Sequence, residues 1–154
     1  MTLPAYDRYA EDQVLHASPM DIVVFLYNRA LVRLQEAEEN AKRNPALYSA
    51  GIEKALRIID ILLEGLRPVE SSSITENLQR LYFYMQSELT QAHGSVLGVT
   101  RVSVVRRDLA TLLEGWEKAA EDVRRSARST QQARVSPAAL IDAEREGALH
   151  RWEA

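Results

Sequence analysis

The chain has 154 residues, enough for one domain with a sizeable hydrophobic core. Its formal net charge is −3, so the chain has no overall positive field that would attract nucleic acid or anionic lipid. A partner bound through net charge is therefore not indicated. Cysteine is absent, so disulfides, thiolate chemistry and cysteine metal sites are excluded together. With only six glycines and five prolines, the composition favours helices over turn-rich β folds.

Residues 1–17 precede the first strong helix signal. They have neither the basic n-region nor the apolar h-region of a signal peptide, and we expect a cytoplasmic protein. The longest apolar run, Ile22 to Tyr27, is too short for insertion into a membrane. We predict that this N-terminal cap segment docks on the rest of the chain through four apolar side chains, Tyr6, Tyr9, Val14 and Leu15.

The first predicted helix begins at Ser18-Pro19-Met20-Asp21. The serine side chain can accept from a free N–H of the first turn, proline fits the first helical position, and the acidic residue complements the positive end of the helix. Apolar residues then recur at intervals of three and four as far as about Arg43, which predicts an amphipathic helix. They are Val23, Leu26, Tyr27, Ala30, Leu34, Ala37 and Ala41.

The second predicted helix begins after Asn44-Pro45, where asparagine caps the start and proline stops the helix before it. It ends between Gly65 and Pro68. Its apolar face contains Ile52, Ala55, Ile59, Leu62, Leu63 and Leu66.

The third predicted helix follows Ser71, Ser72 and Ser73, and Glu76 stands three residues after the last serine to complete a capping box. Its apolar face contains Ile74, Leu78, Leu81, Tyr82, Met85, Leu89 and Ala92. Tyr82, Phe83 and Tyr84 are consecutive, so they spread over about 200° of the helix and cannot all face one seam. We expect at least one of them at the edge of a groove, where an aromatic side chain anchors a partner.

The fourth predicted helix runs from about Thr100 to Arg128, after a loop bracketed by Gly94 and Gly98. Its apolar face contains Val102, Val105, Leu109, Leu112, Trp116, Ala119 and Val123. Residues 129–154 form a C-terminal tail, which is either mobile or a short helix.

Four amphipathic helices with short connections predict an all-α fold, an antiparallel four-helix bundle with up-down-up-down topology. Each apolar stripe needs a partner, and short loops make successive helices antiparallel neighbours. We predict the bundle over residues 18–128, with the cap segment 1–17 before it and the tail 129–154 after it.

Catalytic and metal-binding patterns are missing. A di-iron bundle needs Glu-x-x-His pairs, and none of His16, His93 and His150 stands three residues after a glutamate. We therefore predict no enzyme, no cofactor and no metal site. A histidine phosphotransfer bundle acting through His93 is the alternative, against the simpler interpretation of an exposed histidine at a helix end.

Six arginines on the fourth helix alternate with acidic residues and indicate a solvated face: Arg101, Arg106, Arg107, Arg124, Arg125 and Arg128.

Several short motifs follow one another in chain order. They are Tyr6-x-x-Tyr9, Val14-Leu15-x-Ala17-Ser18-Pro19, Ile22-Val23-Val24-Phe25-Leu26-Tyr27-Asn28, Lys54-Ala55-x-x-Ile58-Ile59, Glu76-Asn77-Leu78-x-x-Leu81-Tyr82-x-Tyr84-Met85-x-x-x-Leu89-x-x-Ala92 and Trp116-Glu117-Lys118-Ala119. Over about residues 5–120 the sequence thereby resembles the FliS family of flagellar secretion chaperones. It departs from the family pattern at Asp12, Asn28-Arg29, His93 and the loop from Gly94 to Val99, differences that concern partner specificity rather than fold.

The resemblance implies a cytoplasmic chaperone of type III flagellar export that binds the disordered C-terminal segment of flagellin and prevents premature polymerisation. An adaptor for another secreted coiled-coil protein is a further alternative function. The sequence does not decide whether the protein is a monomer or a weak dimer. The cap segment would act as a lid over the client site or contact a component of the export gate. The predicted flagellin-binding groove contains eight residues, each of which the sequence alone allows in groove or core: Ile22, Leu26, Ile59, Leu63, Leu78, Tyr82, Met85 and Leu89.

Overall fold

The structure is a computed structural model, and it describes residues 18–67 and 71–134. The helices in these ranges are α2 (Pro19–Asn40), α3 (Pro45–Gly65), α4 (Ser73–Ala92) and α5 (Gly98–Arg134), and the same ranges contain no strand. The prediction of an all-α fold is confirmed. The predicted lid residues Tyr6, Tyr9, Val14 and Leu15 and most of the tail lie outside the described residues.

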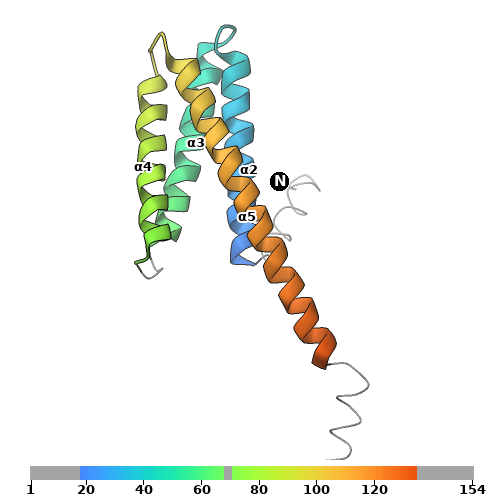
Figure 1. Cartoon of the computed structure of the whole chain (residues 1–154). Helices are drawn as coiled ribbons and strands as arrows, with labels where there is room; N and C mark the ends of the chain where they lie inside the picture. The colour runs from blue at the N-terminus through green and yellow to red at the C-terminus, as the bar shows by residue number, and fades with distance from the viewer. Residues whose placement is uncertain (1–17, 68–70, 135–154) are drawn as a thin grey trace, which may run out of the picture. The chain divides into compact units, whose positions relative to one another are not determined.

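The chain divides into two compact units, residues 1–117 and residues 118–154, and the boundary falls within α5. In the first unit, α2, α3, α4 and the N-terminal part of α5 pack as an antiparallel bundle (Figure 1). In the second unit, Ala120 is buried and residues 121–134 of α5 are exposed and mostly polar, with Glu121 3.4 Å from Arg124 and 3.9 Å from Arg128.

Two of the predicted helix starts are confirmed in detail. At Ser18 the side chain accepts from the Asp21 N–H at 3.2 Å, and the Asp21 carboxylate accepts from the Ser18 N–H at 3.3 Å, a reciprocal capping box. At the start of α3 the Asn44 side chain accepts from the Leu47 N–H at 3.2 Å. Local sequence therefore sets where α2 and α3 begin.

The predicted capping box between Ser73 and Glu76 is wrong. Ser72 caps α4, because it has the extended backbone that a cap requires and its hydroxyl accepts from the Thr75 N–H at 3.2 Å. Ser73 is already the first helical residue, and Glu76 instead accepts from the Ser71 hydroxyl at 3.0 Å.

The core lies along the centre of the bundle in the first unit. Its largest fully buried side chains come from all four helices: Tyr27, Leu34, Ile52, Ile59, Tyr82, Met85, Leu89, Val102, Val105 and Leu109. Most predicted apolar faces are thus confirmed. On α5, Leu113 is buried where Leu112 was expected, and on α4 Ile74 is 71% exposed. Each buried aliphatic side chain contributes about 1.5–3 kcal/mol of transfer free energy.

Polar contacts fix the register at the end of the bundle that holds the α2–α3 and α4–α5 connections (Figure 1). The Tyr48 hydroxyl of α3 donates to the Ala92 carbonyl, the last residue of α4, at 3.1 Å. Arg101 of α5 forms an ion pair with Glu88 of α4 at 2.9 Å. Arg106 of α5 forms an ion pair with Glu38 of α2 at 2.7 Å. These pairs agree with antiparallel packing of α3 on α4 and of α5 on both α4 and α2.

Candidate functional site

An apolar groove lies near the start of α2 and the end of α3. Its volume is about 280 Å³, and none of its lining residues is charged. All four helices contribute to the lining, which consists of Pro19, Ile22, Val23, Leu26, Ile61, Leu62, Gly65, Leu66, Tyr82 and Trp116. Below, "the groove" means this set of residues.

The floor of the groove is aromatic. Tyr82 and Trp116 line it, and Tyr27, fully buried, packs against both with ring centroids 6.4 Å and 6.3 Å away. The hydroxyl oxygens of Tyr27 and Tyr82 are 2.6 Å apart and share a hydrogen bond. Burial raises the pKa of both phenols above the ordinary value, because the charged form cannot be hydrated there. Both tyrosines therefore stay neutral at physiological pH.

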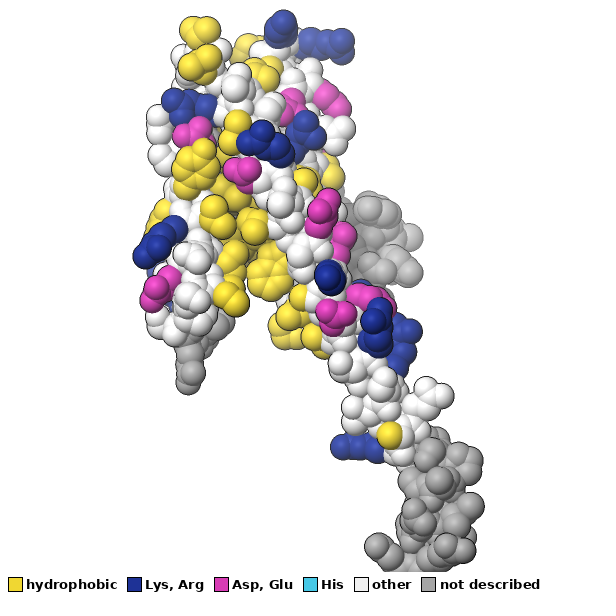
Figure 2. Space-filling view, in the orientation of Figure 1, with side chains coloured by type: hydrophobic (Ala, Val, Ile, Leu, Met, Phe, Trp, Pro, Cys, Tyr) yellow, Lys and Arg dark blue, Asp and Glu magenta, His cyan; other side chains and the backbone are white. Residues whose placement is uncertain are grey.

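A row of side chains on α4 extends the apolar surface. Ile74, Leu81 and Glu88 are seven residues apart, about two turns each, so they lie on one side of the helix. Glu88 contacts α5 through its ion pair with Arg101, whereas Leu81 is 37% exposed and Ile74 is 71% exposed. Figure 2 shows hydrophobic side chains gathered between α4 and α5 on this face. Ile74 and Leu81 therefore add exposed apolar surface to α4.

The eight predicted groove residues separate into two groups. Ile22, 36% exposed, lines the groove together with Leu26 and Tyr82. Leu63 is partly buried against the core, while four residues are buried within it: Ile59, Leu78, Met85 and Leu89. Sequence reasoning placed Trp116 on a buried face and did not assign Ile61 or Leu66 to the site. Leu66 belongs to the predicted apolar face of α3, whereas Ile61 lies outside that face.

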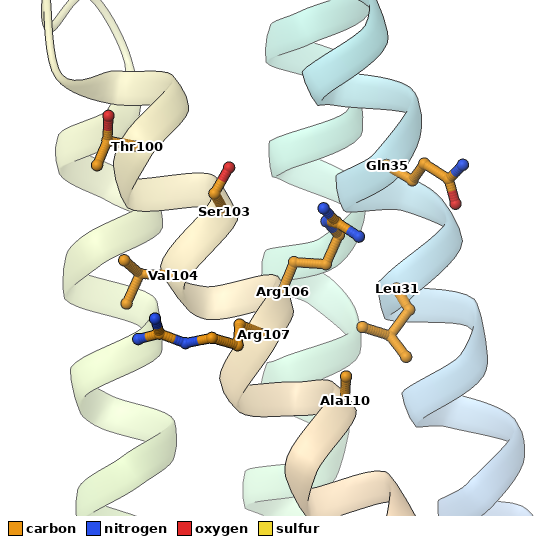
Figure 3. Close-up of a pocket in the computed structure, with 8 residues that line it drawn as sticks. All are labelled: Leu31, Gln35, Thr100, Ser103, Val104, Arg106, Arg107 and Ala110. Atoms are coloured by element: carbon orange, nitrogen blue, oxygen red, sulfur yellow. The ribbon is translucent and has the colours of Figure 1, made fainter.

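A second and larger cavity, about 660 Å³, lies between α2 and α5. Leu31 and Gln35 of α2 line one side, and the α5 side is formed by Thr100, Ser103, Val104, Arg106, Arg107 and Ala110. Figure 3 shows Arg106 directed toward α2, where its guanidinium is held by Glu38, and Arg107 directed to the opposite side. Size alone would favour this cavity, but two charged side chains line it, so it suits an apolar segment less well than the groove.

His93 is the residue through which the alternative, a histidine phosphotransfer bundle, would act. His93 is exposed and occupies the position after the last residue of α4, and Gly94 follows with a φ of +67°. Within residues 18–67 and 71–134, no three histidine or carboxylate side chains gather as they would around a metal ion. In the same ranges, no helix combines the length and the apolar character needed to cross a bilayer.

The fold and the site define the class of the protein: a four-helix bundle with an apolar groove on its surface. The sequence matches the family model described as "Flagellar protein FliS" over residues 2–123. The match includes every residue of the groove and ends within α5. The chain belongs to the FliS family of flagellar export chaperones, a family of chaperones rather than enzymes. A search of curated proteins finds no match.

Proposed function

We propose that this protein is a cytoplasmic chaperone that binds the C-terminal segment of flagellin at the groove. Binding covers the apolar face of the segment, prevents premature polymerisation, and keeps the client competent for export. The observation that carries the proposal is an uncharged groove, lined by all four helices, in a chain of the FliS family.

The size of the groove indicates how the segment binds. At about 280 Å³ the groove is just below the usual range of small-molecule pockets, roughly 300–1,000 Å³, so it accepts one anchoring side chain rather than a whole helix. The remaining contact comes from the exposed side chains of Leu81 and Ile74 on α4, together with Ile22 at the groove itself. A segment that folds as it binds must offset its ordering cost, which takes roughly 1,000–3,000 Å² of buried surface. An anchor in the groove and contacts along α4 are a combination suited to that requirement.

The cap segment is the second part of the proposal. Tyr6, Tyr9, Val14 and Leu15 act as a lid that competes with flagellin or as a contact for the export gate. Deletion of residues 1–15 should change either flagellin affinity or export. Unchanged values for both would refute the lid.

Calorimetric titration with flagellin tests the client assignment, using flagellin that lacks its C-terminal segment as the negative ligand. Ile22→Glu places a charge in the groove, and we expect it to weaken binding at least tenfold because the carboxylate loses its hydration when the segment docks. Val32→Glu is the matched control: Val32 is also on α2, is 45% exposed, and lines neither cavity. Equal affinity for full-length and truncated flagellin would contradict the proposal.

A further inference from the structure

The connection between α4 and α5, residues 93–97, presents two apolar side chains to solvent. Val96 is fully exposed and Leu97 is 61% exposed, and neither belongs to the core. Polar residues, glycine and proline are the usual residues of a turn, so the fold itself gives no reason for an apolar pair here. Exposed apolar side chains that gather at one place mark a contact surface. Below, "the apolar tip" means Val96 and Leu97.

The backbone around the apolar tip is held in place. The Ser95 hydroxyl accepts from the Leu97 N–H at 3.2 Å, and the Ser95 carbonyl accepts from the Gly98 N–H at 3.0 Å. Gly98 packs closely on the Ala92 carbonyl, and a Cβ added to it would lie 2.7 Å from the Tyr48 hydroxyl. The turn is thereby fastened to α3 and α4, and the two apolar side chains stay outside the bundle.

Two cations lie at the same end of the bundle, in the connection between α2 and α3 (Figure 1). Lys42 and Arg43 are both exposed, and neither forms an ion pair with another described residue. Of the two carboxylates nearest to them in the chain, Glu38 is neutralised by Arg106, which leaves Glu39 to oppose them. Figure 2 shows hydrophobic and cationic side chains together at this end. The net charge of the whole chain is −3, so the positive field is local and acts over about 10 Å.

The shape and size of the apolar tip restrict the partner. Two aliphatic side chains bury on the order of 100 Å² each, whereas a stable protein interface takes roughly 800 Å² from each partner. A second copy of the chain joined tip to tip therefore has too little contact. A bilayer needs no complementary pocket, because its hydrocarbon surrounds an inserted side chain of any shape, and its anionic headgroups attract cations beside the tip.

We propose that this end of the bundle binds reversibly to the surface of a bilayer that contains anionic lipid. Val96 and Leu97 insert among the headgroups, and Lys42 and Arg43 lie against the lipid phosphates. Two short side chains give a weak attachment, comparable in kind to that of a single acyl chain. The inference goes beyond the proposed function, because the groove lies at the other end of the bundle, near the start of α2 and the end of α3. A client in the groove would leave the apolar tip free.

Sedimentation of the full chain with vesicles, in the absence of flagellin, tests the proposal. The vesicles contain equal amounts of phosphatidylglycerol and phosphatidylcholine, and vesicles of phosphatidylcholine alone are the neutral comparison. We expect the wild type to bind the anionic vesicles at least fivefold more tightly than the neutral ones, and less tightly as the salt concentration rises.

Two double variants separate the contributions, and we expect each to weaken binding to the anionic vesicles at least fivefold. Val96→Ser with Leu97→Ser removes the apolar tip, and Lys42→Ala with Arg43→Ala removes the cations. Ile74→Ser is the matched control, because Ile74 is 71% exposed but lies in the first turn of α4, at the other end of the bundle, and we expect unchanged binding. Circular dichroism verifies that all variants fold.

Three results would overturn the proposal. The first is a wild type that does not sediment with the anionic vesicles, and the second is equal binding by the wild type and the variant that lacks the apolar tip. The third is self-association of the wild type in sedimentation velocity that the same variant loses while vesicles capture neither, since the tip would then join copies of the chain. None of these measurements involves flagellin, so they leave the proposed function to its own test.

Discussion

At Gly51 the structure predicts how much an added methyl group lowers the free energy of unfolding. A Cβ atom added there would lie 2.7 Å from the Arg33 carbonyl oxygen and 2.9 Å from the Ala37 Cβ, both on α2. A backbone carbonyl cannot rotate away as a side chain can, so α2 and α3 must move apart. Overpacking of this kind costs about 1–3 kcal/mol. We therefore expect Gly51→Ala to destabilise the protein, although alanine is the better helix former.

Gly115→Ala is the control, because it makes the same chemical change inside α5 with nothing within 4 Å of the new Cβ. Only helix propensity acts there, and we expect a stabilisation of about 0.5–1 kcal/mol. The two substitutions should therefore have opposite signs.

Urea unfolding followed by circular dichroism measures both variants. With a slope of roughly 2 kcal/mol per molar urea, Gly51→Ala should lower the midpoint by about 0.5–1.5 M and Gly115→Ala should raise it. A Gly51→Ala protein as stable as the wild type would refute the close approach of α2 and α3 at this position.

Three further predictions concern charges, caps and pH. Glu88→Ala leaves the partly buried Arg101 guanidinium without its ion pair and should destabilise the protein by about 1–3 kcal/mol in the same urea assay, while adding Arg101→Leu should recover part of that loss. Ser18→Ala removes the capping box of α2 and should cost about 1 kcal/mol, and a thermal midpoint equal to that of the wild type would contradict the cap. Burial raises the pKa of Tyr27 and Tyr82 in the folded protein, whereas both phenols ionise near pH 10 when the chain is unfolded. Their contribution to the free energy of unfolding is therefore complete below pH 10 and is lost as the pH rises above it. The double variant with phenylalanine at both positions should show a shallower decline above pH 10, and an unchanged decline would contradict this account.

The sequence predicted the helices well because their starts depend on neighbouring residues. Ser18, Pro19 and Asp21 form a capping box without help from the rest of the chain, and Asn44 caps α3 in the same way. The end of α5 was predicted too early, at Arg128 instead of Arg134. The apolar period stops near that point, but no proline or glycine interrupts the helix-forming residues that follow.

The sequence could not separate groove from core, because helical periodicity identifies a face and not what covers it. Leu26 and Ile59 both lie on predicted apolar faces, yet Leu26 lines the groove and Ile59 is fully buried. Ile74 was expected in the core but is exposed on the same side of α4 as Glu88, which does reach α5. How far a neighbouring helix covers a face is a property of the tertiary structure, and the periodicity of a single sequence does not predict it.

Emission from Trp116 tests the central claim most directly, because this side chain lines the groove. The chain has two tryptophans, so a Trp152→Phe variant leaves Trp116 as the sole reporter. We predict that full-length flagellin shifts the emission to shorter wavelength with a saturable dependence on concentration, as the docked segment excludes water from the groove, and that flagellin without its C-terminal segment has no effect. Binding of flagellin with no change at Trp116, or an equal change with both forms, would contradict the assignment of the groove as the client site.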